Sequence, residues 1–508
     1  MPTLPPALDG QSLALNTAFA VAHGAAVPPI DPAAMERVRA GRALVSQLLA
    51  SGRAVYGITT GFGKLKHVQI EAADAATLQL NLLRSHAVGV GPHAPENAVR
   101  LLLLLRLNTL LRGNSGVRPE VCELLLAMLQ RNVLPLVPEQ GSVGACGDLA
   151  PLAHLALVMV GEGEAHVNGV LMPGSEALER AGLKPLTLEA KEGLALINGT
   201  SFSTAVAVLA HGKARCALRH ANLAAAMTIE ALQGSHRPFD ARVAAIRPHP
   251  GHARVAERMR ALLQNSAIAA EHEHCNRVQD PYSLRCTPQV HGAVEDALQH
   301  TGEVFHREMN SATDNPLLFP EDGESLSAGN FHGEAVALAA DYAKCAVAEL
   351  GSIAERRIEN LVNPDLSHLP PFLAGGKPGL NSGLMMAQVT AAALVSENKG
   401  LAHPASVDSI PTSANQEDHV SMSPIAARTF RAITENVRHV LAVEILAATF
   451  ALDWQKGRRA GDGVEAARQF LAQEIAPPSE DRLFGKDIRH VRELMDSGRL
   501  MSAVLKPR

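Results

Sequence analysis

The sequence predicts a mainly α-helical protein, an elongated bundle of long helices with a smaller, loop-rich N-terminal part. Of its 508 residues, 47% are hydrophobic and only 3% are aromatic. Ala and Leu, the strongest helix formers among apolar residues, are abundant. Gly and Pro interrupt the chain often up to about residue 200 and rarely over long stretches after it. We therefore expect two parts, residues 1–200 and residues 201–508.

Three segments of the second part are predicted to be long helices. They run from Glu334 to Asn360, from Met385 to Leu401 and from Pro424 to Leu452. Ser423 is a suitable N-cap for the last one, and Pro is favoured at the first helical position. Helices of about 27 residues span roughly 40 Å. Such helices usually lie in a bundle or at a subunit interface.

The N-terminal part is predicted to contain short elements. Residues Tyr56 to Gly63 are typical of a glycine-rich loop, and Asn168-Gly169 predicts a hairpin turn within Val167 to Leu171. Two segments between these breaks are apolar on nearly every face, and we expect them to be helices buried on several sides: Glu96–Leu111 and Pro151–Val160.

Charge and cysteine usage exclude several classes of protein. The net charge of −5 is small and there is no long basic run, so neither nucleic acid nor an anionic membrane is an expected partner. Residues Leu13 to Val27 lack the positive start of a signal peptide, and no apolar run approaches the ~18 residues of a membrane span. Because the six cysteines show no disulfide or zinc spacing, we expect a cytoplasmic protein.

A metal-dependent hydrolase is a distant alternative. The chain has 22 histidines, and Glu271-His-Glu-His274 combines potential ligands in one short string. However, the His-Glu-x-x-His spacing is absent, and the string lies in a polar segment typical of solvent-exposed chain. We therefore predict no metal site.

The segment from Gly141 to His154 is the most informative one. Its three glycines at positions 141, 144 and 147 could simply form a loop that caps the helix beginning near Pro151. A phosphate-binding loop is a second interpretation, since helix N-termini attract anions. The absence of Gly-Lys-Ser/Thr and of a preceding strand pattern argues against it.

The whole segment resembles the signature of the aromatic amino acid ammonia-lyases, in which an Ala-Ser-Gly tripeptide cyclises. Here Ala145-Cys146-Gly147 occupies those positions. The resemblance implies that the Gly147 nitrogen attacks the Ala145 carbonyl, an approach that only a residue without Cβ permits. Loss of water and of the Cβ substituent of residue 146 then gives 4-methylidene-imidazol-5-one (MIO). This internal electrophile requires no external cofactor.

Cys146 departs from the family pattern, which has Ser at this position. Three interpretations stay open: the tripeptide remains uncyclised and inactive, the cysteine was introduced in place of serine, or the thiol leaves in place of the hydroxyl. A thiol of pKa about 8.5 gives a better leaving anion than water, whose pKa is about 15.7. We therefore expect the ring to form.

The resemblance extends over nearly the whole chain, and further blocks resemble the histidine-acting members of the family. Two of the three tyrosines fall within them. The blocks are Tyr56-Gly-Ile-Thr-Thr-Gly-Phe-Gly63, Ser85-His86, Asn198-Gly-Thr200, Gln279-Asp-Pro-Tyr-Ser-Leu-Arg-Cys286, Gly329-Asn-Phe-His332 and Thr412-Ser-Ala-Asn-Gln-Glu-Asp-His419.

Three of these residues match the family's acid–base and anchoring groups. Tyr56 matches the catalytic base, and Tyr282 is a second catalytic tyrosine and the first alternative base. Arg285 matches the arginine that binds the substrate carboxylate, for which a planar guanidinium is suited. On a helical turn Tyr282 and Arg285 would share a face. The structural alternatives are a buried Tyr56 phenol bonded to a carbonyl and an Arg285 paired with an acid.

Five further residues are expected to bind the ring or the substrate. Asn198 and Gln279 match polar groups that hold them, and Phe331 matches an aromatic neighbour of the ring, with core packing as its alternative. His86 and Glu417 match residues that bind the substrate side chain. A carboxylate can accept from an imidazole N–H, which a phenyl ring does not have.

The resemblance therefore implies a carbon–nitrogen lyase that eliminates ammonia from L-histidine and gives trans-urocanate, the first step of histidine degradation. It also implies a homotetramer with shared active sites. The alternatives are a lyase or 2,3-aminomutase acting on tyrosine or phenylalanine. A helical scaffold without activity would leave the clustering of these motifs unexplained.

Overall fold

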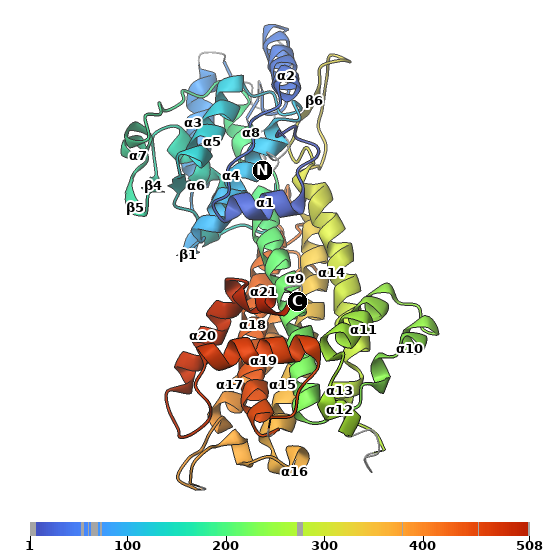
Figure 1. Ribbon diagram of the computed structural model, residues 1–508. Coiled ribbons are helices and arrows are strands. Elements are labelled where there is room, and N and C mark those ends of the chain that lie inside the picture. The colour runs from blue at the N-terminus through green and yellow to red at the C-terminus, as the bar shows by residue number, and fades with distance from the viewer. Residues whose placement is uncertain are drawn as a thin grey trace. The chain divides into compact units, whose positions relative to one another are not determined.

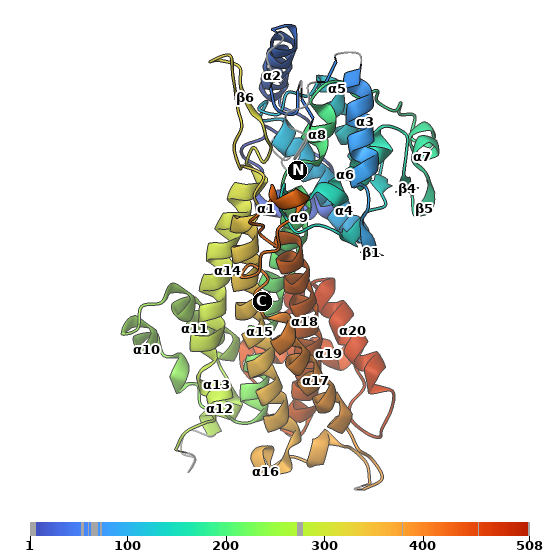
Figure 2. The same ribbon diagram turned by 180° about the vertical axis from the view of Figure 1, so that it is seen from behind.

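The computed structural model describes residues 7–51, 55–58, 60–61, 70–71, 74–271, 278–377, 379–455 and 457–505. Helices make up most of these residues, and the described strands are only three or four residues long. Figures 1 and 2 show the coiled ribbons that dominate both compact units of the chain. The predicted mainly α-helical fold class is confirmed.

The chain forms two compact units that are interleaved along the sequence. The first comprises Met1–Ala210, Thr301–Asp341 and Pro404–Arg428, and the second His211–His300, Tyr342–His403 and Thr429–Arg508. The first unit thus contains three segments that follow residue 200, namely 201–210, Thr301–Asp341 and Pro404–Arg428. Four helices contribute residues to both units: α9 (Ser201–Ala231), α14 (Thr287–Met309), α15 (Glu334–Val362) and α18 (Ser423–Asp453).

The three predicted long helices are present with nearly the predicted bounds. They are α15, α17 (Met385–Leu401) and α18. Helix α9, as long as α18, and the 23-residue α14 were not predicted as long helices. Helix α9 is buried along almost its whole length, so it lacks the polar stripe that marks an amphipathic helix.

Buried polar pairs tie the long helices together within the second unit. Arg357 of α15 binds Glu444 of α18 through Nε at 2.5 Å and Nη2 at 2.9 Å, and both side chains are fully buried. His291 of α14 lies 2.8 Å from the Asn222 side-chain oxygen of α9. Buried charges need such partners because desolvation is costly. These pairs therefore fix which helix faces meet.

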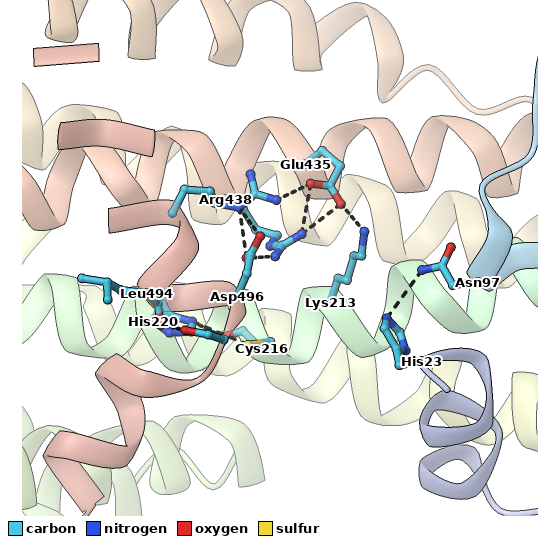
Figure 3. A network of polar contacts seen from close by, with 11 residues as sticks. His23, Asn97, Lys213, Cys216, His220, Glu435, Arg438, Leu494 and Asp496 are labelled. Atoms are coloured by element: carbon cyan, nitrogen blue, oxygen red, sulfur yellow. Dashed lines mark hydrogen bonds and ion pairs between the residues drawn. The ribbon is translucent and has the colours of Figure 1, made fainter. Parts of the chain in front are cut away.

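A charged network links α20 (Phe484–Asp496) to the long helices of the same unit, as Figure 3 shows. Glu435 accepts from Lys213 Nζ at 2.7 Å, from Arg438 Nη1 at 2.9 Å and from Arg492. Burial raises the pKa of Glu435, but these cations outweigh it and lower the pKa to about 2. Arg438 and Arg492 also contact Asp496 at the end of α20.

The first unit packs short helices around buried apolar ones. Helices α4 (Glu96–Leu110) and α6 (Leu149–Met159) are almost entirely buried, as predicted. Strands β4 (Glu164–Val167) and β5 (Val170–Pro173) form the predicted hairpin. Its turn residues Asn168 and Gly169 have φ of 52° and 78°, as a two-residue turn requires.

The remaining elements complete the two units. Those of the first unit are α1 (Leu15–Ala22), α2 (Pro32–Ala50), α3 (Ala75–His86), β1 (Val90–His93), α5 (Pro119–Gln130), β2 (Val133–Pro135), β3 (Pro138–Gln140), α7 (Gly174–Arg180), α8 (Glu192–Ile197), β6 (Leu317–Phe319), β7 (Glu324–Leu326) and η5 (Ser413–Asn415). Those of the second unit are η3 (Arg237–Phe239), α10 (Ala241–Ala245), α11 (Pro250–Leu263), α12 (Ala267–Glu271), α13 (Tyr282–Arg285), α16 (Pro364–Ser367), η4 (Pro371–Leu373), α19 (Asp462–Glu474) and α21 (Arg499–Leu505). Within the described ranges, no helix combines the length and apolar character needed to cross a membrane.

Candidate active site

The predicted electrophile lies in a loop between β3 and α6, which we call the tripeptide loop (residues 141–148). Its three glycines all have positive φ. At Gly147, where φ is 69°, an added Cβ would lie 2.2 Å from the Gly199 carbonyl oxygen. The two glycines also form an isolated parallel bridge. A side chain at position 147 is therefore excluded both by backbone conformation and by the neighbouring chain.

Asp148 holds the end of this loop against the start of α9. Its N–H donates to Gly199 O at 2.7 Å, and its carboxylate accepts from Ser203 N at 2.8 Å and Ser203 Oγ at 2.6 Å. The first turn of a helix has unpaired N–H groups and a positive dipole end, so it stabilises a carboxylate. Burial raises the pKa of Asp148 to about 6, although the bonds from Ser203 lower it.

The segment 420–423 also holds the tripeptide loop through hydrogen bonds. Met422 N donates to Val143 O at 2.8 Å, and Ser421 Oγ donates to Gly144 O at 3.1 Å. An added Cβ at Gly144 would lie 2.3 Å from Ser421 Oγ. Ala145, Val420 and Met422 form a small apolar cluster beneath these bonds. The loop backbone is thus fixed by hydrogen bonds and packing together.

Cys146 and Glu417 are in direct contact. In the uncyclised tripeptide, Cys146 Sγ donates to Glu417 Oε1 at 3.0 Å. Burial raises the pKa of the Cys146 thiol, and the adjacent Glu417 raises it further. The thiol therefore stays protonated as a donor. The other Glu417 oxygen accepts from Thr412 Oγ1 at 2.6 Å, which fixes the carboxylate from its far side.

His86 lies at the end of α3 and is half-buried. Its Nδ1 lies 2.8 Å from Leu82 O and 3.0 Å from Ser85 Oγ. Burial lowers the pKa of His86, while the Leu82 carbonyl and the charge of Glu417 raise it. A carbonyl only accepts, so Nδ1 carries the proton and Nε2 carries the lone pair of the neutral ring.

Asn198 is buried next to the glycine that meets Gly147. Its Nδ2 donates to Asn315 O at 3.0 Å, and its own carbonyl accepts from the buried Arg106 at 2.8 Å. Its Oδ1 has no hydrogen-bond partner among the described residues. A buried acceptor without a donor is costly, so this atom is suited to a donor that the uncyclised chain does not provide.

Tyr56 and Phe331 belong to the same unit as the tripeptide loop. Both are half-buried. Tyr56 lies in a turn in which Gly57 N donates to Thr60 Oγ1 at 3.3 Å. Residues 59, 62 and 63 of the predicted glycine-rich loop lie outside the described residues. The roles of Tyr56 and Phe331 stay predictions.

Tyr282, Arg285 and Gln279 belong to the second unit. The guanidinium carbon of Arg285 lies 4.4 Å from the centre of the Tyr282 ring on α13, so the predicted shared face is present. Arg285 Nε donates to Asp280 O at 3.1 Å. The Tyr282 side chain is 71% exposed in the single chain, and Gln279 is exposed as well.

Comparison with known proteins shows the family of the chain. The family model described as aromatic amino acid lyase matches residues 13–473. The chain belongs to the aromatic amino acid lyase family. It is 54% identical to the histidine ammonia-lyase of Anaeromyxobacter dehalogenans over 502 residues, which covers 97% of this chain and 99% of that protein.

Solved structures of family members have the same fold. Histidine ammonia-lyase from Trypanosoma cruzi superposes with a TM-score of 0.91 at 42% identity, covering 98% of this chain and 94% of that one. Tyrosine aminomutase from Streptomyces globisporus superposes with a TM-score of 0.93 at 37% identity, covering 98% of both chains. The family and its histidine ammonia-lyase members indicate that the chain is a carbon–nitrogen lyase.

The residues around the tripeptide loop fit the cyclised group implied by the family. Gly147 has no Cβ, as the ring requires of this residue, and the neighbouring Gly199 leaves no room for one. Asn198 provides a buried oxygen without a partner next to that contact. Asp148 fixes the Gly147–Asp148 peptide against Gly199 through its own N–H.

Sequence reasoning missed the residues that hold the loop, chiefly Asp148, Ser203 and Ser421. Asp148 directly precedes α6 and therefore looks like its N-cap, yet its side chain makes no capping bond to that helix. It binds the first turn of α9 instead. The only signal in the sequence was an acidic residue in a glycine-rich segment, and it does not indicate which helix the carboxylate binds.

We expect Asp148→Ala to destabilise the protein much more than Ser203→Ala. The first change removes a charged acceptor and leaves Ser203 N–H buried without a partner, a loss of about 2–3 kcal/mol or more. The second removes only the hydroxyl bond, about 1 kcal/mol. The midpoint of urea unfolding at one protein concentration measures both. Equal midpoints for the two variants would show that the carboxylate does not hold the loop.

Proposed function

We propose that this chain eliminates ammonia from L-histidine without oxidation and releases trans-urocanate, the first step of histidine degradation. The observation that carries the proposal is the position of Glu417, whose carboxylate contacts Cys146 at the centre of the tripeptide. An imidazole N–H can donate to such a carboxylate, whereas a phenyl ring has no hydrogen-bond donor. The histidine ammonia-lyases at 50–54% identity support the same substrate.

The electrophile proposed here is MIO, formed from Ala145, Cys146 and Gly147. Its formation balances as follows: the Gly147 nitrogen bonds to the Ala145 carbonyl carbon with loss of water, and Cys146 then loses its sulfur as H₂S. When present, the group supplies an electron-poor methylidene carbon that no protein side chain offers. Gly147, Asn198 and Asp148 are the residues that would hold it.

The local environment changes the argument for cysteine as a leaving group. Sequence reasoning compared a free thiol with water, but burial and Glu417 raise the pKa of the Cys146 thiol. The thiol is therefore a poorer leaving group here than its free-solution pKa indicates. Departure of the sulfur has a second effect, since Glu417 Oε1 then loses its present donor. That oxygen becomes able to accept from a substrate imidazole.

The other candidate residues supply binding and proton transfer in this proposal. Tyr56 removes the β-proton, which requires the phenolate because a free tyrosine has pKa about 10. Arg285 binds the substrate carboxylate through its planar guanidinium. His86 presents the Nε2 lone pair of a neutral ring, which can accept from a substrate N–H. Tyr282 assists catalysis, and Gln279 and Phe331 complete the substrate site.

The proposed assembly is a homotetramer in which several subunits build each active site. Its support is the exposure of candidate site residues on a single chain, since Tyr282 is 71% exposed and Gln279 is exposed too. A second copy could cover them. We also propose a cytoplasmic location. The five cysteines among the described residues are all free thiols, which is typical of a reducing compartment.

A 2,3-aminomutase or lyase acting on tyrosine or phenylalanine is the second candidate. The structural similarity to tyrosine aminomutase at 37% identity favours it. The products distinguish the candidates: an aminomutase returns a β-amino acid, whereas a lyase releases ammonia and an unsaturated acid. Incubation of the purified protein with L-histidine, L-tyrosine and L-phenylalanine, followed by product analysis, decides between them.

Glu417→Gln is expected to reduce histidine turnover by about two orders of magnitude with little change in stability. Loss of a charge-assisted contact in a desolvated site costs roughly 2–3 kcal/mol of transition-state binding. Steady-state kinetics measures this, with unfolding midpoints as the control for folding. Wild-type kcat/KM in the variant would remove Glu417 from the substrate site.

Tyr56→Phe is expected to abolish turnover while the tripeptide still cyclises, because only the proton acceptor is lost. Tyr282→Phe is the matched variant and should retain more activity. Turnover and the intact mass of each variant are measured together. If Tyr56→Phe is fully active and Tyr282→Phe is not, Tyr282 is the base.

Cys146→Ser should remain active, whereas Cys146→Ala should be nearly inactive because it has no Cβ substituent that can leave. Mass spectrometry of the peptide that contains residues 145–147 should show loss of water plus H₂S in the wild type. In Cys146→Ser it should show loss of two waters. An unmodified Cys146 in protein that turns over histidine would contradict the proposed electrophile.

A further inference from the structure

Two histidines and a glutamate from distant parts of the sequence lie together in the first unit. One potential ligand atom from each of His332, Glu334 and His419 lies within 4.8 Å of the other two. His332 and Glu334 are half-buried and His419 is exposed, so an ion can reach them from solvent. We propose that these three residues form a binding site for a divalent transition metal ion such as Zn²⁺.

The backbone brings the two ligand-bearing segments together. Gly333, between the first two ligands, approaches the 420–423 segment so closely that an added Cβ would lie 2.3 Å from Ser423 Oγ. His332 and His419 also stack, with ring centres 5.7 Å apart and an angle of 8° between their planes. The cluster is therefore held by chain packing. A cluster formed only by flexible side chains would not require glycine at position 333.

Two of the three ligands, His332 and Glu334, each present an atom that can bind a cation. His332 Nε2 lies 3.3 Å from the His419 carbonyl oxygen, which only accepts, so the ring proton is on Nε2 and the lone pair is on Nδ1. Histidine ligands of metals commonly donate their other N–H to a backbone carbonyl in this way. Glu334 Oε2 is buried and has no hydrogen-bond partner among the described residues. This carboxylate oxygen can therefore accept from a hydrogen-bond donor or bind a cation.

The ligand set selects the class of ion. Two imidazoles and one carboxylate suit Zn²⁺ and similar ions and leave a fourth position for water, whereas Mg²⁺ prefers oxygen ligands. Tetrahedral zinc at about 2.0–2.2 Å from each ligand places the ligand atoms about 3.3–3.5 Å apart. The present separations of up to 4.8 Å therefore require the side chains to close around the ion.

Titration of the metal-free full chain with Zn²⁺ tests the site by calorimetry. We expect His419→Ala and Glu334→Gln each to weaken binding of one Zn²⁺ per chain at least tenfold, because loss of even an outer partner of a ligand weakens metal sites about 10–100-fold. His300→Ala, which removes an exposed histidine outside the cluster, should bind as the wild type does. Equal affinity in all four proteins would overturn the proposal.

Thermal unfolding provides a second measurement that does not use turnover, so its result is independent of the proposed function. A ligand that binds only the folded state raises the Tm. Saturating Zn²⁺ should therefore raise the Tm of the wild type and of His300→Ala, but not that of His419→Ala. Mg²⁺ at the same concentration should have no effect. A shift of equal size in His419→Ala, or an equal effect of Mg²⁺, would contradict the site.

Discussion

The close approach of two backbones at Gly147 and Gly199 is the constraint on which the rest of the site depends. Neither position tolerates a side chain: a Cβ on Gly199 would lie 2.2 Å from Thr313 O, and one on Gly147 equally close to Gly199 O. Three chain segments therefore stack through bare backbone. Such packing fixes the backbone of the tripeptide loop, and under the proposed function it would hold the Gly147 nitrogen in position for attack on the Ala145 carbonyl.

The positions of the acidic residues Asp148 and Glu417 depend on the same packing. Asp148 is fully buried, which raises its pKa, and the two donors from Ser203 in the first turn of α9 lower it. Glu417 is less buried and is held between Cys146 and Thr412. Of these two acids, only Glu417 is placed so that a departing group leaves an oxygen open to a substrate. Asp148 and Glu417, the acid proposed to bind the substrate, thus differ in whether one of their hydrogen-bond donors can leave.

The sequence predicted elements better than contacts. Helices α15, α17 and α18 were predictable because few breakers interrupt them, and the β4–β5 hairpin because Asn168-Gly169 is suited to positive φ. The contact between Cys146 and Glu417 joins residues 271 positions apart, and no local pattern encodes it. The cluster of His332 and His419 spans 87 positions and was missed for the same reason. Residues whose roles depend on long-range packing could be predicted only through resemblance to a family.

The turn that carries Glu417 shows how strain and binding balance at this site. Ser413, Ala414 and Asn415 have φ of 50°, 51° and 64°, a left-handed conformation that costs about 1–2 kcal/mol per residue, or roughly 3–6 kcal/mol together. Thr412 and Glu417 close the turn with two backbone bonds and one to the carboxylate.

Those three bonds contribute about 2.5–6 kcal/mol in total, so the turn gains almost no net stability from its own closure. The bonds between Thr412 and Glu417 hold the strained turn and fix the orientation of the Glu417 carboxylate, and they do not depend on the Cys146 thiol. Strained non-glycine backbone is most often found where a side chain must be held in one orientation for function.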